Sequence, residues 1–208
     1  MRHRIIVGHL ALLLVAPLMA QAPVGWKVRI DHSQSAQDPD NTRDIKFATM
    51  GKGFRVIGGP AGVFWNPANT ATGNYTARAT FNLMEPSNHT NYYGLVFGGG
   101  ELEGARQSYT YFLVAQDGTY LVKRRDGEDV RDVKPATPHA SVKRPDATGR
   151  STNAVELRVS GNTISYVVNG TVVHTTPKTG LTAKTDGIVG VRINHLLNVQ
   201  VEGFEIQR

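Results

Sequence analysis

Cysteine is absent from all 208 residues of this chain, and the absence excludes several classes of protein. A chain without cysteine has no disulfides, no thiol nucleophile and no thiol to carry a lipid. The hydrophobic core alone must therefore hold the fold, and a small disulfide-stapled scaffold is excluded.

Long hydrophobic runs are also scarce, because the chain contains a single one, "IIVGHLALLLVAPLMA". Arg2 and Arg4 precede this run and small residues end it at Ala20, which is the order typical of a secretory signal peptide. The run is shorter than the roughly 20 residues that a membrane-spanning helix needs. We therefore predict a signal peptide over residues 1–20 and export to the periplasm or the cell exterior. A single domain, not membrane-spanning after cleavage, is predicted over residues 21–208.

The sequence also lacks a long run of like-charged residues. Lysine and arginine number 23 against 17 acidic residues, for a net charge of +6, and the basic residues are dispersed. The longest basic cluster, "KRR" at Lys123–Arg125, is typical of a solvated strand face. The sequence therefore predicts no nucleic-acid partner.

Several catalytic and metal-binding motifs are absent. The histidines show no H-x-H or H-E-x-x-H spacing, and no G-x-S-x-G motif is present. The stretch "DPDNTRD" offers the carboxylates of Asp38, Asp40 and Asp44, which are hard oxygen ligands suited to calcium. It lacks the glycine and the distal glutamate of an EF-hand, so calcium and a plain polar loop both stay open, and no other cofactor is predicted.

Sustained helical periodicity is missing, and short alternating runs bounded by turn residues take its place. The best example is "NAVELRVSGNTISYVVNGTVVHTT", which predicts three strands with turns at Gly161-Asn162 and Asn169-Gly170. Residues 134–149, with three prolines, are predicted as a surface loop. Further strands are predicted over Trp26–Ile30, Phe54–Ile57, Val63–Trp65, Tyr75–Leu83, Tyr92–Phe97, Gly187–Ile193 and Val199–Ile206. About a dozen strands with turn signals between them predict an all-β, two-sheet antiparallel jelly-roll sandwich.

One hairpin carries a set of tyrosines. In "SYTYFLVAQDGTYLVKRRDG" a two-residue turn at Asp117-Gly118 pairs Ala115 with Tyr120 and Tyr111 with Arg124. That register places three tyrosines and an arginine on one face, where rings and hydroxyls would suit a sugar. The alternative is that the tyrosines fill the space between the sheets. The predicted ligand-binding residues are Tyr92, Tyr109, Tyr111, Tyr120 and Arg124.

Two carboxylates in "GLVFGGGELEGARQ" are the candidate catalytic acids. Glu101 and Glu103 would lie about 6.7 Å apart on one face of a strand, within the roughly 5–9.5 Å that separates the two acids of glycosidases. The neighbouring glycines instead indicate a turn, which makes the pair the tip of a loop between the strand that ends at Phe97 and the tyrosine hairpin.

The order of five segments carries a family resemblance. "NYYGLVFGG", "YTYFLVAQDGTYLVKRR", "NAVELRVSGNTISYVVNGTVV", "GIVGVRI" and "VQVEGFEI" follow one another. Together they resemble the concanavalin A-like lectin and glucanase superfamily, in its laminin-G-like bacterial branch. The chain is also similar to exported bacterial domains grouped with keto-disaccharide hydrolases. The resemblance spans Trp26 to Arg208 and implies a concanavalin A-like jelly roll.

The superfamily includes lectins, carbohydrate-binding modules, glycosidases and adhesion domains, so the resemblance implies a fold more than an activity. Its laminarinase-like glucanases carry E-x-D-x-E or E-x-D-x-x-E, and this chain has Ala105 and Arg106 where the third acid would fall. We expect a secreted domain that binds a saccharide or a cell-surface glycan without hydrolysing it. The alternatives are a keto-disaccharide-type glycoside hydrolase using acids such as Glu101, Glu103, Asp117 or Asp126, and an envelope domain that binds a protein.

Overall fold

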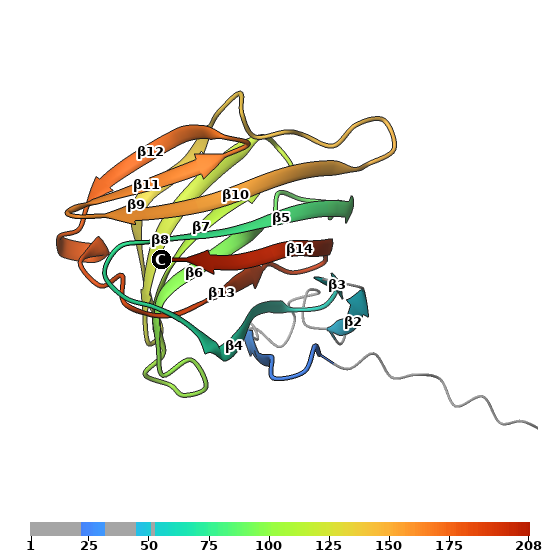
Figure 1. The fold of residues 1–208 in the computed structure, drawn as a ribbon. Helices are drawn as coiled ribbons and strands as arrows, with labels where there is room; N and C mark the ends of the chain where they lie inside the picture. Colours follow the sequence, from blue (N-terminus) through green and yellow to red (C-terminus); the bar gives the residue numbers. More distant parts are fainter. Residues whose placement is uncertain (1–21, 32–44, 51–52) are drawn as a thin grey trace, which may run out of the picture.

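Two antiparallel sheets of seven strands each lie face to face (Figure 1). The computed structural model describes residues 22–31, 45–50 and 53–208. Sheet A contains, in spatial order, β1 (Lys27–Asp31), β4 (Ala61–Ala71), β13 (Gly187–Ile193), β6 (Tyr92–Gly100), β7 (Ser108–Ala115), β8 (Thr119–Asp126) and β9 (Asp129–Pro138). Sheet B contains β12 (Thr171–Pro177), β11 (Thr163–Val168), β10 (Ser151–Ser160), β5 (Tyr75–Glu85), β14 (Asn198–Gln207), β3 (Gly53–Ile57) and β2 (Lys46–Met50). The predicted all-β jelly-roll sandwich is confirmed.

The three strands predicted from alternation, β10, β11 and β12, form consecutive antiparallel pairs. Along β10, Val155, Leu157 and Val159 are buried while the residues between them face outward. Asn169 and Gly170 both have positive φ, 50° and 82°, as the type I′ turn between β11 and β12 requires.

The main core fills the space between the sheets. Phe81 of β5 lies 5.7 Å from Tyr93 of β6, and Phe112 of β7 lies 5.2 Å from Tyr166 of β11, measured between ring centroids. All four side chains are fully buried, and each such burial contributes roughly 1.5–3 kcal/mol. No helix in the described part of the chain is long and apolar enough to cross a bilayer.

Two edge strands differ from the sequence prediction. Neither β9 nor β2 was predicted, and residues 134–138 of β9 are strand where a loop was predicted. Most of β9 is exposed on both faces and it contains Pro135. An edge strand tolerates proline and needs no apolar alternation, so its sequence reads as a loop.

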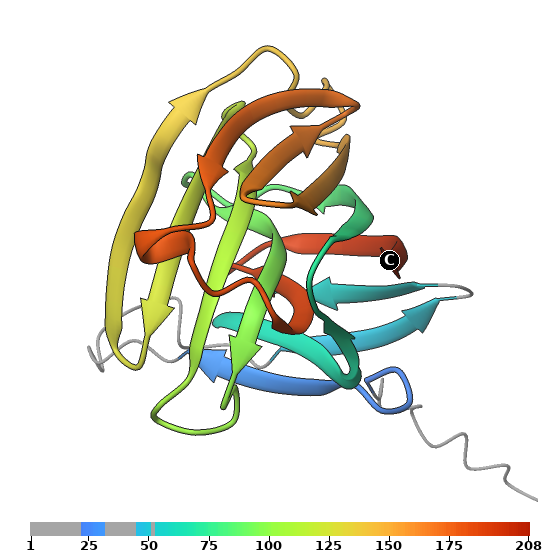
Figure 2. The ribbon, with the colours of Figure 1, turned by 60° about the vertical axis from the view of Figure 1, so that its left-hand side comes forward.

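Sheet A curls strongly toward its outer face, which is the face turned away from sheet B. Strands β1 and β8 are separated by four strands in the sheet order, yet Asp31 of β1 lies 3.6 Å from the Arg125 guanidinium of β8. Figure 2 shows β1 running toward the lower end of β8. The curl encloses a second apolar cluster, here called the tyrosine cluster: Val63, Trp65, Val96, Leu102, Tyr109, Tyr111, Leu113 and Leu121.

Candidate functional site

In the hairpin formed by β7 and β8, which carries the tyrosines, the strand pairing is shifted by one residue from the predicted register. Val114 pairs with Tyr120, and the Gly118 amide donates to the Ala115 carbonyl oxygen at 3.1 Å, which makes a three-residue loop. Gly118 has a φ of 86°, as expected for a type I turn followed by a left-handed residue. Because a one-residue slip moves each side chain to the other face, the prediction that Tyr120 and Arg124 share a face with Tyr109 and Tyr111 is wrong.

The five predicted ligand-binding residues therefore divide between two faces. Tyr92, Tyr109 and Tyr111 lie on the outer face of sheet A, whereas Tyr120 and Arg124 face sheet B. Their predicted binding role stays a prediction.

Two of the tyrosines on the outer face are covered. The exposed fractions of Tyr109 and Tyr111 are 0% and 7%, and only Tyr92 is half-buried. Arg192 of β13 donates to the Tyr109 hydroxyl at 2.9 Å, and its guanidinium lies 5.3 Å from the centre of the Tyr111 ring. The tyrosines therefore pack within the curl of sheet A and do not form an open platform.

A buried ionic group, the Asp31 cluster, closes this curl. Asp31 pairs with Arg192 of β13, with Arg125 of β8 at 3.6 Å, and with Arg29 of its own strand at 3.5 Å. Burial alone would raise the pKa of Asp31, but the three guanidiniums outweigh it and hold that pKa below its ordinary value. The cluster fixes β1 over the outer face of sheet A.

The two candidate catalytic glutamates lie in a loop, as the glycines indicated. Strand β6 ends at Gly100, and Glu101 follows with a φ of 51°. Glu101 pairs with Arg106 at 3.0 Å, whereas Glu103 pairs with Lys27 of β1. Between them Leu102 is 2% exposed and packs into the tyrosine cluster. The loop therefore covers one end of the outer face, with each carboxylate held by a different cation.

The calcium candidates Asp38, Asp40 and Asp44 lie outside the described residues, as does the predicted signal peptide. Within residues 22–31, 45–50 and 53–208, no group of three or more histidine, aspartate or glutamate side chains is placed to hold a metal ion. The calcium prediction therefore rests on the sequence alone.

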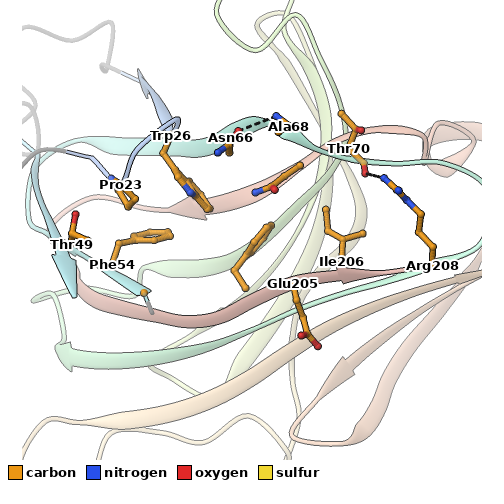
Figure 3. A pocket seen from close by; sticks show the side chains of 13 residues that line it. Pro23, Trp26, Thr49, Phe54, Asn66, Ala68, Thr70, Glu205, Ile206 and Arg208 are labelled. Carbon is orange, nitrogen blue, oxygen red and sulfur yellow. Dashed lines mark hydrogen bonds between the residues drawn. The ribbon is translucent and has the colours of Figure 1, made fainter. Parts of the chain in front are cut away.

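An open pocket of about 710 Å³ lies between the edges of the two sheets, where β1 and β4 approach β3 and β14 (Figure 3). Three aromatic rings form its apolar wall, and the Trp26 ring lies 4.7 Å from Phe54 and 5.4 Å from Phe204. Figure 3 shows the rings of Trp26 and Phe54 turned into the hollow. The aromatic pocket, as we call it, is lined by Pro23, Trp26, Thr49, Gly53, Phe54, Asn66, Ala68, Asn69, Thr70, Phe204, Glu205, Ile206 and Arg208.

A bulge in β4 builds one wall of the aromatic pocket. Gly190 of β13 pairs with Trp65, but Ile188 pairs with Thr70, so residues 66–69 of β4 lie opposite a single residue of β13. Pro67 falls within this bulge, where no ladder hydrogen bond is required of it. The Asn66 side chain accepts a hydrogen bond from the Ala68 amide at 2.9 Å and so closes the local turn.

A second bulge, in β14, builds the opposite wall. Its pairing with β5 shifts between Glu202 and Glu205, at Gly203, which has a φ of 59°. The shift changes the alternation, so that Phe204 packs against the core while Glu205 pairs with Arg78 outside. Bulges often redirect side chains beside binding sites, and here two of them turn aromatic and amide groups toward one hollow.

A turn before β1 positions Trp26. Its amide donates to the Pro23 carbonyl oxygen at 2.9 Å, and Gly25 has a φ of 81°, as position i+2 of a type II turn requires. A Cβ atom at Gly25 would lie 2.8 Å from the Asn66 side-chain nitrogen. The turn is therefore pressed directly against the β4 bulge.

Arg208 supplies a cation at the rim, where its guanidinium donates to the Thr70 carbonyl oxygen at 3.0 Å. Glu205 points away from the rings in Figure 3. The aromatic pocket therefore combines an apolar wall of aromatic rings with amide groups and one guanidinium. Sequence reasoning missed it, because its aromatic residues come from segments near opposite ends of the chain and each reads as an ordinary core position.

Two facing seven-stranded antiparallel sheets of this kind define a concanavalin A-like jelly-roll sandwich. Among solved structures, the carbohydrate-binding module CBM66 from Bacillus subtilis is similar, with 8% identity, a TM-score of 0.62, and coverage of 88% of this chain and 96% of that one.

A protein of unknown function with a galectin-like fold, also from Bacillus subtilis, has 12% identity and a TM-score of 0.57, with 88% of each chain covered. The Emp46p carbohydrate recognition domain in its potassium-bound form has 14% identity and a TM-score of 0.55, again with 88% of each chain covered. At these identities the likeness shows the fold alone. No protein-family model and no curated protein matches the sequence.

Proposed function

We propose that this protein is an exported domain that binds a saccharide or cell-surface glycan in the aromatic pocket. The observation that carries the proposal is the convergence of the Trp26, Phe54 and Phe204 rings with Asn66 and Asn69 around one open hollow. Sugars present C–H faces that pack on aromatic rings and hydroxyls that bond to amides. Two of the similar solved structures, CBM66 and Emp46p, carry carbohydrate binding or recognition in their names.

The scarcity of carboxylates among the described residues that line the aromatic pocket favours binding without hydrolysis. Among the described lining residues Glu205 is the one carboxylate, and it pairs with Arg78 on the outside. Glycoside hydrolysis commonly uses two carboxylates that flank the scissile bond. Asp117 accepts hydrogen bonds from Thr119, and neither it nor Asp126 lines the aromatic pocket.

The test is a glycan array and a polysaccharide pull-down with residues 21–208, followed by titration calorimetry on any ligand found. Trp26→Ala removes the central ring, and we expect it to weaken binding by about tenfold or more. A tenfold loss of affinity corresponds to about 1.4 kcal/mol of binding free energy, and truncation of an aromatic anchor commonly costs at least that much. Asn69→Ala removes an amide at the rim without disturbing the rings, and we expect a smaller loss.

The matched control is Tyr92→Ala, which removes a half-buried aromatic side chain from the outer face of sheet A. We expect this variant to bind like the unmodified protein. Binding that depends on Tyr92 and ignores Trp26 would move the site to the tyrosine cluster. An array without any binder, or release of reducing sugar by the unmodified protein, would contradict the proposal itself.

A further inference from the structure

A second hollow, of about 400 Å³, lies between the β8–β9 hairpin and the short 3-10 helix η2 (Gly180–Thr182). Its described lining includes Arg124, Arg131 and Lys184 as cations but a single carboxylate, Asp126. The aromatic pocket shares none of these residues. Positive charge therefore exceeds negative charge by two among the described groups that line this second hollow.

The two arginines converge on Asp126. Arg124 donates to its carboxylate through Nε at 3.1 Å and Nη2 at 2.6 Å, and Arg131 donates through Nη2 at 2.8 Å. Ser108 stands opposite Asp126 in the β7–β8 ladder and accepts from Lys184 Nζ at 3.3 Å. Hydrogen bonds from Arg124 are the largest cause that holds the pKa of Asp126 below its ordinary value. Asp126 thus orients the two arginines but balances only one of the three charges.

Two buried polar atoms beside this group have no hydrogen-bond partner in the described part of the chain. One is Nη1 of Arg124, a residue that is only 6% exposed, and the other is Oγ1 of Thr110, which is fully buried. Arg124 and Thr110 are paired across the β7–β8 ladder. A buried donor without a partner costs stability, so Nη1 of Arg124 has hydrogens to donate to an acceptor that the described part of the chain does not supply.

We propose that this hollow, the Arg124 site, binds the oxyanion of a sulfate or phosphate group. A planar guanidinium held by a carboxylate presents its remaining N–H groups in a fixed direction, which suits a tetrahedral oxyanion. Free sulfate or doubly charged phosphate balances both excess positive charges, a sulfate ester balances one of them, and each accepts hydrogen bonds from Lys184 and Arg131 at the mouth. The group is either a free ion or an ester on a polymer.

The experiment is titration calorimetry of the full mature chain at low ionic strength with four probes: inorganic sulfate, inorganic phosphate, dextran sulfate and neutral dextran. We expect Lys184→Gln and Arg131→Gln each to weaken anion binding by about tenfold. Both side chains are exposed, so these variants keep the fold. Lys184→Arg keeps the charge and is expected to retain most of the affinity.

The matched control is Arg106→Gln, which removes another exposed arginine that is ion-paired with a carboxylate, Glu101. It should bind anions like the unmodified protein, and so should Trp26→Ala, since the two sites share no residue. Binding of inorganic sulfate or phosphate identifies a free-ion site, and binding of dextran sulfate alone identifies a polymer ester. No binding by any charged probe, or binding that survives both Lys184→Gln and Arg131→Gln, overturns the proposal.

Discussion

Asp31 allows the electrostatics of the curled sheet to be tested by a single substitution, Asp31→Asn. The carboxylate faces three guanidiniums and is 11% exposed, while its main partner Arg192 is 10% exposed as a side chain. Removing one partner of a buried ion pair leaves the other charge uncompensated and costs roughly 3–5 kcal/mol. The asparagine amide keeps a hydrogen-bond acceptor, so we expect Asp31→Asn to lower the free energy of unfolding by about 3 kcal/mol. For a domain of this size that loss corresponds to a fall of about 6–12 °C in Tm.

The pH dependence gives the prediction a second readout. The folded-state pKa of Asp31 is depressed, so its contribution is fully present above its unfolded pKa of about 4 and is lost as pH falls through the folded value. The free energy of unfolding, measured with urea, should therefore differ between the unmodified protein and Asp31→Asn at pH 7. This difference should shrink progressively below about pH 4.

An exposed ion pair supplies the control for this prediction. Asp132 lies 3.2 Å from Lys123 and its side chain is 50% exposed, so Asp132→Asn should cost no more than about 1 kcal/mol. If Asp31→Asn unfolds within about 0.5 kcal/mol of the unmodified protein at pH 7, the Asp31 cluster does not hold β1 in place, and our account of the curl is refuted.

Two further predictions concern the backbone and the core. Gly98 has a φ of 60°, and a Cβ atom at this position would lie 2.3 Å from the Lys184 carbonyl oxygen. Gly98→Ala should therefore lower the free energy of unfolding, measured with urea, by at least about 2 kcal/mol. Gly161→Ala, at a φ of 54° in open space, should cost only about 1 kcal/mol, and equal losses would refute the steric argument. Burial raises the pKa of Tyr166 to about 12, so its contribution is complete below pH 10 and disappears as pH rises through 12. Tyr166→Phe should make the decline in stability over that window shallower, and an unchanged slope would contradict the assignment.

The fold was predictable where alternation and turn chemistry agree. Strand β10 alternates buried and outward-facing residues, and Asn169-Gly170 favours a short turn, so the existence of β10 to β12 and their antiparallel order follow from local sequence. The β7–β8 hairpin was recognised, but Asp117-Gly118 also fits a three-residue loop. Here Asp117 Oδ1 accepts a hydrogen bond from the Thr119 amide at 3.0 Å within the three-residue loop. The sequence alone does not distinguish this loop from a two-residue turn.

The aromatic pocket was not predictable by the same reasoning. It depends on the β4 bulge at residues 66–69 and on the shift at Gly203, each of which reverses the side-chain alternation that sequence reading assumes. It also depends on pairing between segments more than a hundred residues apart, as when β14 pairs with β3. Long-range register and bulges are tertiary properties, so the residues could be placed on strands but not brought to one site.

Strand β1 connects features that have been treated separately. It spans only five residues at the edge of sheet A, with Trp26 immediately before it and Asp31 at its end. Detaching β1 from β4 would remove the central ring of the aromatic pocket and the carboxylate of the Asp31 cluster in a single event. On the proposed function, ligand binding in the aromatic pocket and the docking of β1 are thermodynamically linked. A ligand bound by Trp26 would then protect β1 from hydrogen exchange and proteolysis. Any change that frees β1 would lower the apparent affinity in proportion to the fraction of molecules in which the strand stays docked.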